Sequence, residues 1–216
     1  EIMDQMTICA VENFLQIGLD TTKEAFLLLE VDGMDWEVET QLKQVLEICK
    51  ENGAVQIDAA QTEAERAALW KARKSISGAC GKINPTKIGE DVAVPPANIP
   101  KMIQAVKEIA KRYQLSMVVF GHAGDGNLHP NIMTDKRNIE EMKRVEKAIA
   151  MLFSKALELG GTLSGEHGIG YMKAPYMLQE LGAVGYKMQN QLKQALDPKS
   201  ILNPGKIFIA TEQELL

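Results

Sequence analysis

The sequence predicts a single α+β domain built on an antiparallel sheet that carries helices on one face. Short apolar runs alternate with amphipathic stretches of helical period along all 216 residues, and no repeat, low-complexity tract or linker interrupts them. The apolar runs are short, and several contain polar residues. A parallel sheet is buried on both faces and has more uniformly apolar strands, so the pattern favours a half-exposed antiparallel sheet.

In the first quarter of the chain, two expected strands flank one helix. Residues 25–33 form an apolar run that ends in Asp-Gly, which predicts a strand. Asp35 is the expected cap of a helix whose apolar residues recur every three or four positions, and an Asn-Gly pair ends this helix at 52 and 53. The run AVQIDAA at 54–60 is the second expected strand.

The elements that follow have clear start signals. Thr62 and Glu65 form a capping box that opens a helix rich in alanine, arginine and lysine. Residues 89–95 are typical of a strand. Asn98 is the expected cap of the next helix, which has a proline in its first turn.

The C-terminal half contains two more expected strands and two helical regions. Residues 116–124, SMVVFGHAG, predict a strand, and Asn138 is the expected cap of a long helix. Residues 161–166 predict a short strand. The tail from 175 to 204 reads as helical and is expected to form a small packed appendage, which Asp-Pro and Asn-Pro pairs interrupt.

The composition is that of an ordinary globular protein and excludes several functional classes. A net charge of -5 and a pI near 5.4 give no positive field for nucleic acid, so no nucleic-acid partner is expected. No apolar run approaches the roughly 20 residues of a membrane-spanning helix. The three cysteines are widely spaced and suit a reducing compartment, so a cytoplasmic location is expected.

All three histidines lie in glycine-rich segments. His122 and His129 are seven residues apart in GHAGDGNLHPNI, and a strand that turns at the glycines could aim both imidazoles into one space. Glu166 and His167 are adjacent in SGEHGIG. Two imidazoles and one carboxylate suit zinc, manganese or ferrous iron and leave positions open for a substrate. Spacing alone leaves two interpretations open, a metal site and hydrogen-bonded structural histidines.

Four segments stand in a recognisable order: EDVAVP, GHAGDGNLHPNI, SGEHGIG and LDPKSILNPGKIF. They resemble the C-terminal domain of FAD-linked oxidases of the vanillyl-alcohol oxidase type, a family with glycolate oxidase catalytic subunits, D-lactate dehydrogenases and D-2-hydroxyglutarate dehydrogenase. The resemblance runs from Glu1 to about Phe208. It implies a ferredoxin-like α+β substrate (cap) domain over residues 1–216, with 175–204 as a helical extension. An N-terminal FAD-binding domain is then expected outside this chain.

The resemblance also implies a role for each candidate site residue. The metal ligands would be His122, His129 and Glu166. His167 would be the general base, with a further metal ligand as the alternative. The substrate carboxylate would bind Arg73, other substrate contacts would come from Ser77, Lys87 and Asn131, and Asn203 would approach the flavin ring.

The implied reaction is the oxidation of a D-2-hydroxy acid, of the glycolate or D-lactate type, to the 2-oxo acid, with hydride transfer to flavin N5. The implied cofactors are FAD, bound mainly by the other domain, and a divalent metal. An iron-sulfur or electron-transfer subunit is the implied partner, peripheral to the membrane in the full complex. The chain is expected to be a piece of a longer protein and inactive alone. The alternatives are a stand-alone metal- or carboxylate-binding module and a metallohydrolase with the same ligand set.

Overall fold

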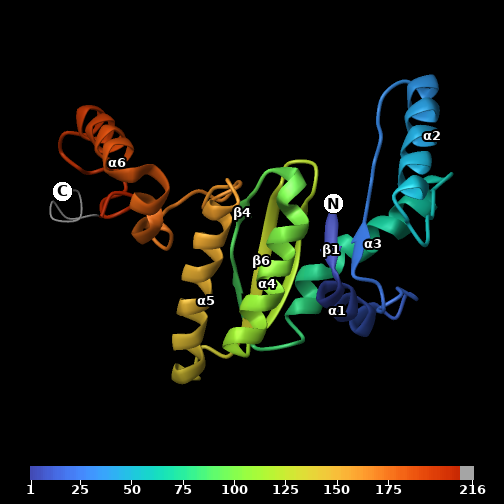
Figure 1. Ribbon diagram of the computed structural model, residues 1–216, viewed down its shortest axis with the longest axis horizontal. Helices are drawn as coiled ribbons and strands as arrows, with labels where there is room; N and C mark the ends of the chain where they lie inside the picture. Colours follow the sequence, from blue (N-terminus) through green and yellow to red (C-terminus); the bar gives the residue numbers. More distant parts are fainter. Residues whose placement is uncertain (210–216) are drawn as a thin grey trace.

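The computed structural model describes residues 1–209 and has a six-stranded antiparallel sheet at its centre (Figure 1). The strand order is β2-β1-β5-β6-β3, and β4 also pairs with β6. The strands are β1 (Ile2–Asp4), β2 (Ala25–Leu27), β3 (Thr86–Gly89), β4 (Val92–Ala93), β5 (Ser116–His122) and β6 (Asn127–Thr134). The predicted α+β class is confirmed.

Within residues 1–209, six α-helices and two short 3-10 turns join these strands. They are α1 (Gln5–Leu15), α2 (Asp35–Glu51), α3 (Glu63–Cys80), η1 (Pro96–Asn98), α4 (Ile99–Tyr113), α5 (Ile139–Glu158), η2 (Ala174–Tyr176) and α6 (Met177–Leu196). Asn138 caps α5 as predicted, since its Oδ1 accepts a hydrogen bond from the backbone N–H of Glu141 at 3.1 Å.

The starts of α2 and α3 differ in how well the sequence predicts them. The capping box is present at α3, where Thr62 Oγ1 accepts from Glu65 N at 3.2 Å and the Glu65 carboxylate accepts from Thr62 N at 3.1 Å. At α2 the predicted cap is wrong by one residue, because Met34 is the cap and Asp35 is the first helical residue. The Glu37 carboxylate accepts from Met34 N at 3.0 Å, which fixes the start at Met34.

Helices pack on both faces of the sheet, not on one face as expected (Figure 1). Helices α4 and α5 cover the face to which Met117 and Val119 point, and α1 and α3 cover the face to which Val118 points. Side chains alternate across a strand, so three consecutive apolar residues supply both cores. The central strand β5 is therefore covered on both faces at residues 117–119.

Three other expected strands are shorter than predicted or are not formed. Residues 54–60 form no strand and pair with none of the six strands, and Val55 is 74% exposed. The run at 25–33 pairs only over its first three residues. The run at 161–166 contributes a single isolated bridge, between Thr162 and Ala93.

The strand predicted at 89–95 is interrupted between β3 and β4 but keeps one register along β6. Gly89 pairs with Asn131, and Val92 pairs with Leu128. The interruption lies opposite Pro130, which has no N–H to donate to the ladder. Two buried acids, Glu90 and Asp91, occupy the interrupted stretch.

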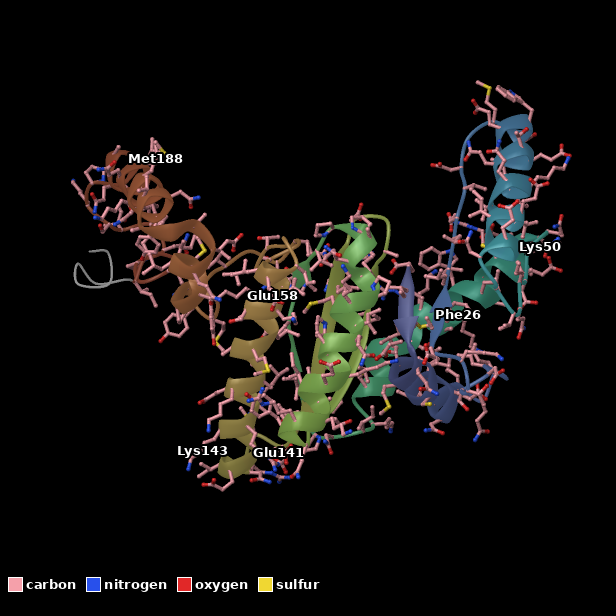
Figure 2. The ribbon with its side chains drawn as sticks, in the orientation of Figure 1. Phe26, Lys50, Glu141, Lys143, Glu158 and Met188 are labelled. Carbon is pink, nitrogen blue, oxygen red and sulfur yellow. The ribbon has the colours of Figure 1, made fainter. Side chains whose placement is uncertain are left out.

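Helices α2 and α6 project away from the sheet, and their side chains point outward on most sides (Figure 2). No residue of α2 is buried. Helix α6 lies within the predicted helical tail and bends at Gly182, where φ is +65°. Among the described residues, no helix combines the length and the apolarity that crossing a bilayer requires.

Candidate active site

The β5–β6 hairpin places His122 and His129 on one face of the sheet. In its register Phe120 is opposite His129, so His122 is a diagonal neighbour of His129 on that face. The two imidazole centroids are 5.3 Å apart. The tight turn requires glycine at 126, where φ is +74° and a Cβ would lie 1.9 Å from the carbonyl oxygen of Val94. The imidazoles converge, as the glycine spacing predicts.

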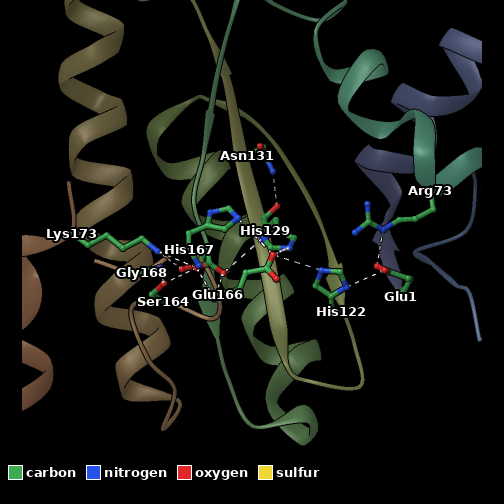
Figure 3. Close-up of polar contacts among 11 residues, drawn as sticks. Glu1, Arg73, His122, His129, Asn131, Ser164, Glu166, His167, Gly168 and Lys173 are labelled. Atoms are coloured by element: carbon green, nitrogen blue, oxygen red, sulfur yellow. Dashed lines mark hydrogen bonds and ion pairs between the residues drawn. The ribbon is translucent and has the colours of Figure 1, made fainter. Parts of the chain in front are cut away.

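Glu166 completes a group of three potential metal ligands. It lies in the loop after α5, and its Oε1 is 3.3 Å from His129 Nε2 and 3.8 Å from His122 Nε2 (Figure 3). The ligand atoms of these three residues all lie within 4.8 Å of one another. Two imidazoles and one carboxylate form a donor set that suits a divalent ion with open positions.

The Nδ1 atoms of both histidines turn away from Glu166 and toward other carboxylates. His122 Nδ1 is 3.0 Å from Glu1 Oε1, and His129 Nδ1 is 3.9 Å from Asp91 Oδ1. The His129 Nδ1 atom is buried and has no hydrogen-bond partner within residues 1–209. Burial lowers the pKa of His129, because it disfavours the imidazolium form. Neutral imidazoles with a carboxylate on the Nδ1 side are typical of metal-ligating histidines.

The buried carboxylate of Asp91 fixes the loop that carries Glu166. It accepts hydrogen bonds from Ser164 Oγ at 2.8 Å, from Glu166 N at 3.0 Å and from His167 N at 2.9 Å. Burial would raise the pKa of Asp91, but these hydrogen bonds and the nearby Lys173 ammonium group lower it to about 2. The loop is therefore held with the Glu166 side chain turned toward the histidines.

Lys173 and Gly165 hold the same loop from other sides. The buried Lys173 Nζ donates to the carbonyl oxygens of Asp91 at 2.6 Å and of Leu163 at 2.8 Å. A Cβ at Gly165 would lie 2.3 Å from Asn127 Oδ1, so only glycine lets the loop pass this close to the hairpin. Sequence reasoning missed the role of Asp91. Its one signal was a pair of acids, Glu90 and Asp91, inside a strand-like run, since a buried carboxylate needs partners.

His167 lies beside the three-residue group and on its open side. Its ring stacks on that of His129, with centroids 5.5 Å apart and planes at 15°. Its Nε2 is 3.6 Å from Glu166 Oε1, and its side chain is 60% exposed. The imidazole can therefore reach a ligand bound beside the group.

Helix α3 places Arg73 near the same face. Arg73 Nε donates to Glu1 Oε2 at 2.7 Å, and the guanidinium lies over the Phe120 ring, 5.1 Å from its centroid. Burial would raise the pKa of Glu1, but the hydrogen bond and charge of Arg73 lower it below its usual value. Glu1 thus links Arg73 to His122. The sequence gives no local signal for this residue, and it was not among the predicted site residues.

The other predicted substrate contacts lie near Arg73 and the histidines. Ser77 follows Arg73 by one turn of α3, and Lys87 Nζ donates to Ser77 Oγ at 3.2 Å. Asn131 lies two residues beyond His129 in β6, is buried, and donates from its amide to the His129 carbonyl oxygen at 2.7 Å. The fold therefore gathers all of these predicted positions around one face of the sheet.

Asn203 is the predicted site residue that the fold does not bring to this group. The segment after α6 that contains it lies beyond α5, at the end of the molecule away from α3 (Figure 1). Asn203 has a φ of +49°, which suits a turn residue. Its expected contact is with a flavin, so this assignment stays a prediction.

Comparison with known proteins relates the chain to flavin-linked enzymes. Residues 1–207 match the family model of FAD linked oxidases, C-terminal domain. The chain is 49% identical to glycolate oxidase subunit GlcD of Bacillus subtilis (strain 168), over 96% of this chain and 44% of that protein. It is 32% identical to a probable mitochondrial D-lactate dehydrogenase of Danio rerio, over 98% of this chain and 43% of that protein. The chain thus spans less than half the length of these relatives.

Solved structures share the fold at low sequence identity. The crystal structure of p-cresol methylhydroxylase with substrate bound matches with a TM-score of 0.65 and 16% identity. The match covers 96% of this chain and 46% of the methylhydroxylase chain. The structure of a 4-ethylphenol oxidase from Gulosibacter chungangensis, in an isoeugenol complex, matches with a TM-score of 0.57 and 16% identity. The match covers 98% of this chain and 47% of the oxidase chain. This likeness supports the α+β architecture alone.

Proposed function

The chain belongs to the FAD-linked oxidases, whose C-terminal domain it matches, and from this premise we propose that it forms the substrate side of an FAD-dependent 2-hydroxy-acid oxidoreductase. The substrate would be a D-2-hydroxy acid of the glycolate or D-lactate type. One observation carries the proposal: two imidazole Nε2 atoms and a carboxylate face a common point near a helix that carries Arg73. A cation site near the guanidinium group of Arg73, which can bind a carboxylate, suits a ligand with adjacent hydroxyl and carboxylate groups. The names of the relatives support the same substrate class.

The residues present fit a divalent ion such as zinc, manganese or iron. His122, His129 and Glu166 would hold it, and the burial of His129 keeps a neutral imidazole available as a ligand. When bound, such an ion lowers the pKa of a hydroxyl group beside it, and FAD supplies the hydride acceptor. Three protein ligands leave room for substrate oxygens.

The chain's own side chains would orient the substrate. Arg73 uses Nε for Glu1, which leaves its two Nη atoms for a bidentate contact with the substrate carboxylate. Ser77 and Lys87 lie hydrogen-bonded to each other near this position and would add a hydroxyl and a positive charge. Asn131 would contact the substrate from β6.

His167 is placed to take the proton from the substrate hydroxyl. It follows Glu166 directly, and its exposed ring lies against His129 on the open side of the group. Imidazole is the side chain best suited to accept a proton near neutral pH, so a ring nitrogen would hold the hydroxyl proton as the hydride leaves carbon.

FAD binding and electron transfer would involve further parts of a longer polypeptide. The chain spans 44% of the Bacillus subtilis relative, and an FAD-binding domain would lie in the remainder, with Asn203 near the flavin ring. The 216-residue chain alone would then hold no FAD and oxidise neither glycolate nor D-lactate. The partner would be an iron-sulfur or electron-transfer subunit, and the full complex would lie in the cytoplasm, peripheral to the membrane. The names of two relatives, glycolate oxidase subunits, support only the existence of a partner chain.

Metal analysis of the purified chain tests the ligand assignment. The wild type should retain about one divalent ion per chain after dialysis, and His122→Ala and Glu166→Ala should retain almost none. His167→Ala should keep its metal, and a loss there would reassign His167 from base to ligand. Equal metal content in the wild type, His122→Ala and Glu166→Ala would remove the proposed centre.

A further inference from the structure

Glu1 joins two parts of the proposed site, and the inference drawn from it rests on the proposed function. Its carboxylate oxygens have separate partners: Oε2 accepts from Arg73 Nε at 2.7 Å, and Oε1 is 3.0 Å from His122 Nδ1 (Figure 3). The side chains of Glu1 and Arg73 are only 15% and 18% exposed, so solvent screens this pair less than a surface ion pair. Within residues 1–209, no second carboxylate pairs with Arg73.

The sheet fixes the backbone on which Glu1 sits. The backbone nitrogen of Glu1 donates to the Leu28 carbonyl oxygen at 2.9 Å, and Leu28 N donates to the Glu1 carbonyl oxygen at 3.0 Å. The next residue, Ile2, is opposite Gly121 in β5, which brings Glu1 beside His122. Glu1 directly precedes β1 and is fixed by these two backbone hydrogen bonds, so its side chain holds its partners in a narrower range of geometry than one on a loop would.

The donor and acceptor properties of the partners decide where the proton of His122 lies. Arg73 only donates, so Glu1 Oε2 accepts from it. The ionised Oε1 can also only accept, so His122 must carry its proton on Nδ1. A neutral imidazole with the proton on Nδ1 has its lone pair on Nε2, the atom that faces Glu166 at 3.8 Å. Glu1 thereby selects the tautomer of His122 that can bind a cation.

We propose that Glu1 is a positioning residue that sets the His122 tautomer for cation binding and orients Arg73 for anion binding. The contact with Arg73 occupies Nε and leaves both Nη atoms for an anionic ligand. Loss of the Glu1 carboxylate would therefore weaken both halves of the site without removing any ligand atom.

Glu1→Gln tests this role through the tautomer of His122. In the variant the glutamine carbonyl must face Arg73, so its NH₂ group faces His122 Nδ1 and needs an acceptor there. The His122 proton should then move to Nε2. ¹⁵N NMR of the His122 imidazole in the metal-free chain, above neutral pH, should show the Nδ1–H tautomer in the wild type and the Nε2–H tautomer in Glu1→Gln. Zinc affinity should fall about 10- to 100-fold in the variant.

Two further variants separate this effect from damage to the fold. Glu24→Gln, at an exposed glutamate just before β2, should keep the wild-type tautomer and zinc affinity. In the double variant Glu1→Gln with Arg73→Ala, the glutamine can turn its carbonyl to His122, so the Nδ1–H tautomer should return.

Two results would overturn the inference: an unchanged tautomer in Glu1→Gln, whatever its zinc affinity, or a double variant that keeps Nε2–H. A wild-type chain that binds no zinc would instead count against the proposed function. The tautomer comparison needs no metal, so it would still decide the role of Glu1.

Discussion

Asp91 offers the sharpest test of how the site is held together. The substitution Asp91→Asn keeps the size of the side chain but replaces one acceptor oxygen by an NH₂ donor. In the native chain Oδ2 accepts from Ser164 Oγ and from the backbone N–H groups of Glu166 and His167, and Oδ1 accepts a longer bond from Glu166 N at 3.3 Å. The amide oxygen can take the Oδ2 position, but the NH₂ group at the Oδ1 position would then face the Glu166 N–H group, a donor that it cannot satisfy.

The expected cost follows from these contacts. A hydrogen bond to a charged group contributes about 1.5–3 kcal/mol and one between neutral groups about 0.5–1.5 kcal/mol, so a neutral amide oxygen at the Oδ2 position weakens all three bonds. The Lys173 ammonium group, 3.5 Å from Asp91 Oδ2, also loses its buried counter-charge, and breaking one side of such a pair costs about 3–5 kcal/mol. These losses overlap, so we expect the free energy of unfolding to fall by about 3 kcal/mol.

Equilibrium urea unfolding at neutral pH, with a chelator present, measures this loss without a contribution from bound metal. Ser164→Ala is the graded control, because it removes one of the donors to Asp91 and should cost about 1–2 kcal/mol. An Asp91→Asn variant within about 0.5 kcal/mol of the wild type, with Ser164→Ala at least as damaging, would refute the view that Asp91 holds the loop.

Two other substitutions probe the surroundings of the site. Burial raises the pKa of Glu90 from 4.5 to about 6, so its contribution to stability is complete below pH 4.5 and is lost as the pH rises through 6. Glu90→Gln should therefore increase the free energy of unfolding by about 2 kcal/mol above neutral pH and change it little near pH 4.5. Urea unfolding at both pH values measures the two effects, and equal effects would contradict this prediction. Gly165→Ala should lower the melting temperature through a cost of about 1–3 kcal/mol, since its Cβ would lie 2.3 Å from Asn127 Oδ1. Gly124→Ala, with open space around its Cβ, should melt within a few degrees of the wild type, and equal melting of the two variants would show that the loop yields to the added methyl group.

The sequence predicts best those parts of the site that depend on local structure. The two histidines converge because a glycine turn pairs adjacent strands, so a span of eight residues contains the whole explanation. The capping box at Thr62 is equally local, and it fixes the helix that carries Arg73. Motif resemblance, rather than pattern, supplies the placement of Glu166 beside the histidines.

The parts of the site that the sequence does not predict depend on contacts between residues that are far apart in the sequence. Glu1 meets His122 across 121 positions, and Asp91 meets Glu166 across 75, so neither contact leaves a local signal. The strand predicted at 54–60 is wrong for the opposite reason: the local signal is present, but the distant partner is not. Its apolar run satisfies the local pattern of a strand, but no neighbouring strand within residues 1–209 pairs with it.

The C-terminal extension also contributes to the site, although it looks like an appendage. Glu180 of α6 accepts hydrogen bonds from Thr162 Oγ1 and from Leu163 N, at the start of the loop that carries Glu166. Lys173, just before α6, holds the Leu163 carbonyl oxygen from the other side. The carboxylate ligand thus depends on contacts from both Asp91 and the C-terminal helix, whereas the two histidines depend on one hairpin. A force or ligand that moves α6 would therefore displace the acid of the site before it displaces the imidazoles.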